Sequence, residues 1–139
     1  MQEFIQMAVN QLGIKEETAR SATGGLLQVL QQNVGADDFQ NLQDAVPGAS
    51  DLLQSVSGGG GEGGGSLLKG VMGKALSAVG VDGGGALGVM GMLSQTGLGA
   101  KQVTQFVSMF VNFLKDQAGA GMVTQLLGKV PELKKLAGL

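Results

Sequence analysis

The sequence contains no cysteine, no histidine, no tryptophan and no tyrosine. Without cysteine there can be no disulfide, no thiolate nucleophile and no zinc–thiolate site. Without histidine, the commonest acid–base catalyst and metal ligand is missing as well. Aromatic residues make up only 4% of the 139 residues, whereas hydrophobic residues make up 43%. The core must therefore be filled by Leu, Val, Met and Ala, which favours closely packed helices over a β-sandwich.

We predict neither a signal sequence nor a membrane-spanning apolar run from this sequence. It begins Met1-Gln2-Glu3, without the basic start and the continuous apolar stretch of a secretory signal. Ser, Gln and Lys interrupt the apolar stretches elsewhere, so we predict no transmembrane segment. We expect a soluble, cytoplasmic protein. A chain from which an export signal had been cleaved would begin in the same way, so an exported protein is the alternative.

Residues 4–53 and 88–137 share one residue pattern, which indicates an internal repeat of a helical unit. Identical residues recur 84 positions apart, and the Val-Pro dipeptides at 46–47 and 130–131 contain both prolines of the chain. Further identical pairs at this offset are Gln11/Gln95, Gly13/Gly97, Leu30/Leu114, Gly35/Gly119, Leu42/Leu126 and Leu52/Leu136. A duplicated unit predicts a pseudo-symmetric scaffold.

Apolar residues at spacings of three and four predict helices along most of the chain. The first helix should end at Gly13, because glycine readily takes the left-handed conformation of a helix stop. We expect longer helices over residues 16–33, 66–79, 86–96 and 100–118, and shorter ones opening at Asp37, at Pro47, near Met122 and at Pro131. The predicted fold class is all-α, with two related helical units packed as a pseudo-symmetric bundle.

Glycine dominates residues 58–65, and its conformational freedom predicts a flexible tether there. We therefore predict an N-terminal helical unit over 1–57, a Gly-rich linker over 58–65, and a C-terminal helical unit over 66–139 with one extra leading helix. The glycines do not match the pattern of a phosphate-binding loop. Ser66-Leu67-Leu68-Lys69 lacks the Gly-Lys-Ser/Thr ending and follows a predicted helix rather than a strand.

The net charge of −2 hides two unlike halves. Residues 1–65 carry two basic and eight acidic side chains, net −6, and residues 66–139 carry seven basic and three acidic ones, net +4. Unlike halves attract, so they should face each other within one chain or across a head-to-tail dimer. A lysine-bearing surface for an anionic partner is the other interpretation. We expect no nucleic-acid partner, because the lysines are scattered, no aromatic platform lies among them and the protein is acidic.

The only adjacent carboxylate pairs are Glu16-Glu17 and Asp37-Asp38. Neighbours on a helix point about 100° apart, so neither pair aims at one point. Both pairs fall in predicted first turns, where acidic side chains stabilise the helix dipole. Serine and threonine have no histidine to activate them. We therefore expect no catalytic residues, no cofactor and no metal site, and hence a non-enzymatic protein. A small hydrolase would need two carboxylates that the fold brings together.

The methionines suggest a binding role instead. Most lie in the second half, and flexible thioethers suit adaptable apolar surfaces. With the apolar stripe of residues 100–118 they form a candidate binding face for a second copy, another protein or a lipid-like ligand. Its residues are Met72, Leu76, Met90, Phe106, Met109, Phe110 and Phe113. Core filling is the alternative interpretation of these residues. Amphipathic helices at 66–79 and 100–118 would also suit an exported protein that acts at a membrane or envelope surface.

Three short segments carry a resemblance to a known family. They are Gln11-Leu12-Gly13-Ile14, Asn33-Val34-Gly35-Ala36-Asp37-Asp38-Phe39 and Ala45-Val46-Pro47-Gly48. These segments resemble the VcgC/VcgE family of uncharacterised bacterial proteins, a domain of unknown function. The resemblance is clearest over residues 4–53, although Lys15 stands where the family usually has serine. It implies an N-terminal export signal in many members and no activity for any residue.

Overall fold

The computed structural model describes residues 1–57 and 86–138, and this part of the chain forms eight helices and no strand. They are α1 (Gln2–Leu12), α2 (Glu16–Asn33), α3 (Ala36–Ala45), α4 (Ala49–Ser57), α6 (Ala86–Gln95), α7 (Ala100–Ala118), α8 (Ala120–Lys129) and α9 (Pro131–Leu136). The prediction of an all-helical protein is confirmed for these residues. The predicted helix at 66–79 and the predicted tether at 58–65 lie outside the described residues.

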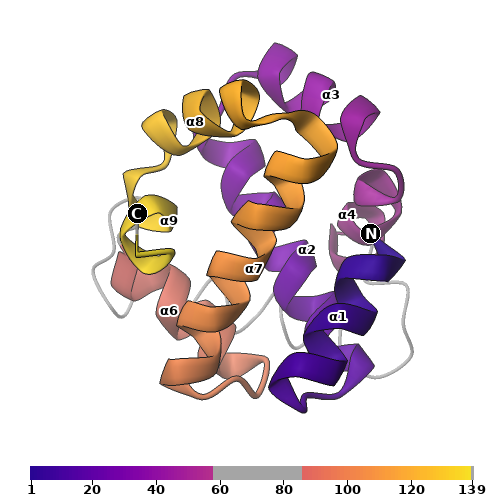
Figure 1. Ribbon diagram of the computed structural model, residues 1–139, viewed down its shortest axis with the longest axis vertical. Coiled ribbons are helices and arrows are strands. Elements are labelled where there is room, and N and C mark those ends of the chain that lie inside the picture. Colours follow the sequence, from indigo (N-terminus) through magenta and orange to yellow (C-terminus); the bar gives the residue numbers. More distant parts are fainter. Residues whose placement is uncertain (58–85, 139) are drawn as a thin grey trace.

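Two long helices, α2 and α7, pass through the middle of the molecule (Figure 1). In this view α1 and α4 lie on one side, α6 and α9 on the other, and α3 and α8 at one end. Both α1 and α6 contact both long helices, whereas α4 packs on α2, and α8 and α9 pack on α7. The first helix of each predicted unit therefore also packs on the long helix of the other unit.

The bounds of the helices recur along the chain. Those of α6, α7 and α8 match those of α1, α2 and α3 to within one residue after a shift of 84. The glycines that follow α1 and α6 both have positive φ, 64° at Gly13 and 102° at Gly97. Buried residues recur at the same offset, as in Leu26/Phe110, Leu30/Leu114, Leu42/Leu126 and Val46/Val130. Both sets of helices thus turn their apolar faces inward at corresponding positions.

One predicted helix start is wrong. We expected Pro47 to open the fourth helix, but α4 begins at Ala49, and Pro47 and Gly48 form a turn before it. The reason is the φ of 88° at Gly48, which lies outside the right-handed helical region. Glutamate stands at the corresponding position 132, and there Pro131 does begin α9 as predicted.

The centre of the core is a cluster of four phenylalanines. The ring of Phe4 on α1 packs against Phe106, Phe110 and Phe113 of α7, with ring centroids 5.2, 5.5 and 5.4 Å apart. The first two pairs are edge-to-face, a geometry that adds roughly 0.5–1.5 kcal/mol per pair to the burial of the rings. Phe4, Phe106 and Phe110 are fully buried. This cluster fixes α1 on α7.

A hydrogen bond from α7 completes the end of α1. Carbonyls in the last turn of a helix have no partner within the helix. The side-chain Nε2 of Gln102 donates to the carbonyl of Leu12 at 3.0 Å, and its Oε1 accepts from the backbone N–H of Gly99 at 2.9 Å. One side chain thus serves the end of α1 and the start of α7 together.

Two glycine substitutions should have opposite effects on stability. Replacing Gly13 by alanine should lower the free energy of unfolding by roughly 1–2 kcal/mol, because an L-residue is strained in the left-handed conformation. Replacing Gly91, which is exposed inside α6 with open space around it, should raise that free energy by roughly 0.5–1 kcal/mol. Urea denaturation measures both changes. Equal stability of the two variants would contradict this account of the turn.

Truncating Phe4 should be the more costly of two substitutions in α1. Phe4→Ala should lower the free energy of unfolding by about 3–5 kcal/mol, because it leaves a cavity among three rings. Met7→Ala on the same helix is the control. Its side chain is 41% exposed, so the change should stay within about 0.5 kcal/mol. Thermal and urea denaturation of both variants measure the difference, and similar losses would contradict the central role of the cluster.

Candidate functional site

A groove of about 530 Å³ opens between the start of α1, the start of α4 and the end of α7. The residues that line it are Met1, Gln2, Glu3, Ile5, Arg20, Pro47, Gly48, Asp51, Leu52, Phe113 and Gln117. Ile5, Leu52 and Phe113 are 2%, 9% and 8% exposed and give the groove an apolar floor. Glu3, Asp51 and Gln117 are exposed, so its rim is polar.

The turn before α4 shapes one wall of this groove. The backbone nitrogen of Met1 donates to the carbonyl of Pro47 at 2.8 Å. A Cβ added at Gly48 would lie 3.5 Å from the Cβ of Met1, an ordinary van der Waals distance, so the neighbouring start of α1 does not itself require a glycine here. Glycine is favoured at position 48 because its φ of 88°, which turns the chain, is one that other residues rarely adopt.

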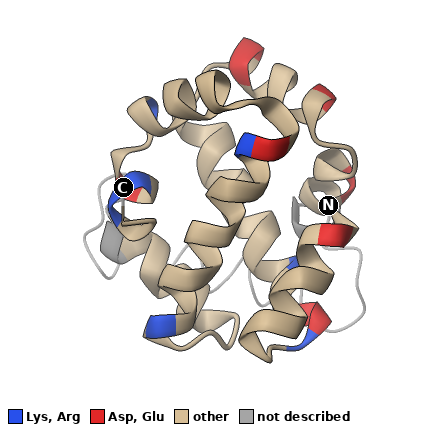
Figure 2. Ribbon diagram, in the orientation of Figure 1, with Lys and Arg blue, Asp and Glu red and all other residues tan. Residues whose placement is uncertain are grey.

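Two acidic side chains and one basic side chain lie along the groove. Arg20 forms an ion pair with Glu16, one turn away on the same helix, with an N–O distance of 2.9 Å. This pairing offsets the positive charge of Arg20, while Glu3 and Asp51 add negative charge on α1 and α4. Figure 2 shows the acidic side of the molecule, with red segments on α1, α3 and α4. The groove therefore combines an apolar floor with an acidic surrounding.

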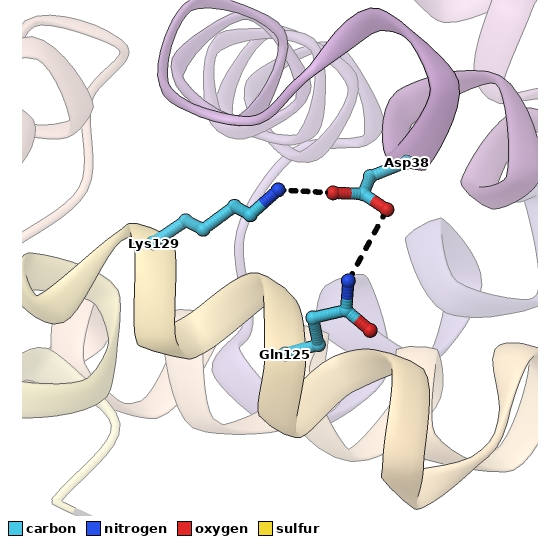
Figure 3. A network of polar contacts seen from close by, with 3 residues as sticks. All are labelled: Asp38, Gln125 and Lys129. Carbon is cyan, nitrogen blue, oxygen red and sulfur yellow. Dashed lines mark hydrogen bonds and ion pairs between the residues drawn. The ribbon is translucent and has the colours of Figure 1, made fainter.

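A polar network joins α3 to α8 at the end of the molecule (Figure 3). Lys129 forms an ion pair with Asp38, and the Nε2 of Gln125 donates to the same carboxylate at 3.4 Å. The carboxylate side chain is 24% exposed and the lysine side chain 42%. This contact links the acidic half of the sequence to the basic half. That the two halves face each other as a whole stays a prediction.

The predicted binding face is distributed over several environments. Phe106 and Phe110 are buried around Phe4, while Phe113 belongs to the same cluster and also lines the groove. Met90 and Met109 are partly buried and pack against the core. Met72 and Leu76 lie outside the described residues. One residue of the predicted face therefore borders the groove, and the face as a whole stays a prediction.

The adjacent carboxylates lie where the sequence predicted. Glu16 and Glu17 are in the first turn of α2, and Asp37 and Asp38 are in the first turn of α3. Among residues 1–57 and 86–138, no three side chains of His, Cys, Asp or Glu are grouped as ligands for a metal ion. In the same residues no helix is both long and apolar enough to cross a membrane. Glu16 and Asp38 each lie in the first turn of a helix and form an ion pair, with Arg20 and Lys129 respectively. These two structural roles explain why an acidic residue stands at each position.

Sequence reasoning missed the groove, because its walls come from four helices and most of its residues carry no local signal. One signal was available in the dipeptide Pro47-Gly48. Proline fixes φ at position 47, and a following glycine can take positive φ, which together indicate a tight turn rather than a helix start. That turn would have predicted a break in the surface between α3 and α4.

The ion pair between Asp38 and Lys129 should make a measurable but modest contribution to stability. A double-mutant cycle with Asp38→Ala and Lys129→Ala should give a coupling energy of about 0.5–1 kcal/mol at low salt, because both side chains are partly exposed. The more exposed pair Glu16–Arg20 is the comparison and should give about 0.3–0.5 kcal/mol. Both values should fall in about 1 M salt. Zero coupling at low salt would show that the network does not hold α3 to α8.

A scan against protein families matches residues 1–131 to the family described as "Protein of unknown function VcgC/VcgE (DUF2780)". Searches of curated proteins and of solved structures give no match. The family match spans nearly all of the 139 residues and confirms the resemblance carried by the three short segments. The chain therefore belongs to the VcgC/VcgE family, whose function is unknown.

Proposed function

We propose that this protein is a non-enzymatic helical binding module and that its binding site is the groove between α1, α4 and α7. The observation that carries the proposal is the combination of an apolar floor, made by Ile5, Leu52 and Phe113, with charged side chains at the rim. Binding pockets typically have this composition, since apolar contacts supply affinity and a few polar groups orient the ligand.

The chemistry of the described residues supports binding rather than catalysis. Glu3 and Asp51 line the groove without histidine, cysteine or a clustered set of acids beside them. Acid–base catalysis needs a positioned pair of groups, and nucleophilic catalysis needs an activated nucleophile. The described groove offers a shaped surface and charge, which are the requirements for recognition.

The scaffold that holds the groove is, in this proposal, a duplicated helical unit. Support comes from the shift of 84 residues that relates the bounds of α1, α2 and α3 to those of α6, α7 and α8. In such a scaffold the residues at corresponding positions can differ between the two units, so that one unit contributes residues to a site and the other does not. Val29 and Asn33, for example, correspond at this shift to Phe113 and Gln117 of the groove.

The groove suits a long amphipathic side chain better than an acyl chain. An acyl chain needs a continuous apolar tunnel, whereas this groove is open and places carboxylates close to its apolar floor. A lysine side chain matches both features, because its stem is apolar and its head is cationic. The membrane-surface alternative receives less support, because the apolar stripe of α7 is buried in the core.

Pentylammonium, which reproduces a lysine side chain, is the probe that tests the groove. Amide NMR should show shifts confined to the groove, at Ile5, Leu52, Phe113 and their neighbours, with a dissociation constant of about 1 mM or weaker for so small a ligand. Gln117→Trp at the rim should abolish these shifts. Gln105→Trp is the matched control on the exposed surface of the same helix, outside the groove, and should leave them unchanged.

Two results would contradict the proposal. Shifts of similar size at the backbone amides of Asp37 and Asp38 on α3, which do not line the groove, would indicate unspecific attraction between charges. Equal shifts with pentanol, which has the same stem and no charge, would remove the role of Glu3 and Asp51 at the rim.

A further inference from the structure

The groove carries charged groups of both signs. Glu3, Arg20 and Asp51 line it. Met1 lines it as well, and its amino group donates to the carbonyl of Pro47 at 2.8 Å. Asp51 is engaged in an interaction of its own, whereas the side chain of Glu3 has no hydrogen bond or ion pair to any residue that the structure describes. The carboxylate of Glu3 is therefore available to the ammonium group of a ligand.

Arg20 can bind a carboxylate in spite of its ion pair. Its Nη2 lies 2.9 Å from the Oε1 of Glu16, and the two side chains are 50% and 60% exposed. Ion pairs with this exposure are weak, because water screens the charges. A guanidinium group also has five N–H donors in a planar fork, which is more than one carboxylate can use. Arg20 can therefore bind the carboxylate of a ligand beside Glu16 or in its place.

Helix geometry gives the spacing between Glu3 and Arg20. The helices α1 and α2 pack on each other and run in opposite directions (Figure 1). They are joined by a short loop centred on Ile14, so Arg20 lies at about the level of Ala8. Glu3 precedes Ala8 by five residues, which is about 7–8 Å along the axis at a rise of about 1.5 Å per residue. Ile5, part of the apolar floor, lies between these two levels.

A ligand that matches this arrangement has an ammonium group and a carboxylate at the two ends of an apolar stem. A lysine at the C-terminus of a polypeptide has this chemistry. The extended distance from its Nζ to its carboxylate carbon is about 7 Å, and the stem between them is apolar. A lysine inside a polypeptide has the ammonium group without the carboxylate. The groove is open, so the preceding residues of a bound polypeptide can leave it.

We infer that the groove selects a lysine at the C-terminus of a polypeptide, with its ammonium group at Glu3 and its carboxylate at Arg20. The inference rests on the proposed binding role of the groove and names its ligand class. Charge complementarity carries it, because the groove presents an available carboxylate and a guanidinium group along one apolar floor.

The compound ε-aminocaproate, which has the same atoms from ammonium group to carboxylate, tests the inference. Pentylammonium has the same stem and no carboxylate. Amide NMR titration of the full chain should give a dissociation constant about three- to tenfold lower for ε-aminocaproate, the gain expected from a charge-assisted contact at an exposed site. A short peptide ending in lysine should bind more tightly than the same peptide with a C-terminal amide by a similar factor.

Variants of the ion pair show whether Arg20 holds the carboxylate. Arg20→Gln should remove the advantage of ε-aminocaproate and leave pentylammonium binding in place. Glu16→Gln breaks the same ion pair but keeps the guanidinium group, so the advantage should persist or increase. Lys15→Gln removes a positive charge at an exposed position that does not line the groove, and should change neither constant. Thermal unfolding reports whether each variant is folded.

A second pair of variants tests the other end of the ligand. Glu3→Gln should weaken the binding of both pentylammonium and ε-aminocaproate, because each has an ammonium group. Glu17→Gln is the control, since this exposed carboxylate does not line the groove, and it should leave both constants unchanged.

Equal dissociation constants for ε-aminocaproate and pentylammonium would overturn the inference and leave the binding proposal intact. So would an advantage that survives Arg20→Gln or that is lost equally in Glu16→Gln, because the guanidinium group would then not hold the carboxylate. Equal binding of the two peptides would also contradict the choice of a C-terminal lysine. Absence of shifts in the groove with all of these ligands would instead overturn the proposed function itself.

Discussion

The packing of Phe4 among three phenylalanines of α7 is the interaction on which the rest of the structure depends. The sequence has five phenylalanines, and four of them are in this cluster. It joins the first helix of the chain to a helix about 100 residues later. The same contact places the start of α1 beside the end of α7, which are two walls of the groove. The cluster that stabilises the core thus also places two of the walls of the groove.

Most helices could be predicted because their signals are local. The periodic apolar residues of 16–33 and 100–118 gave the bounds of α2 and α7, and Gly13 marked the end of α1 through its positive φ. The start of α4 could not be read in this way. Proline at position 47 is compatible with a first helical residue, and the deciding factor was the conformation of the next residue, Gly48.

The site was less predictable than the fold. An apolar stripe shows that a helix face is covered, but it does not show whether the cover is another helix of the same chain or a partner. The stripe of α7 illustrates this, since Phe106 and Phe110 meet Phe4 in the core while Phe113 also borders the groove. Gln117 and Gly48 belong to the groove only through tertiary packing, which no local pattern encodes.

The packing of α1 and α6 on both long helices also determines how the protein unfolds. Because α1 packs on α7 and α6 packs on α2, neither half alone can cover all of its own apolar surface. Although the sequence reads as two units, we expect the described helices to unfold together, because each half covers apolar surface of the other. Cutting the chain between the halves would therefore convert an intramolecular fold into an obligate heterodimer, in which each fragment becomes structured only on meeting the other.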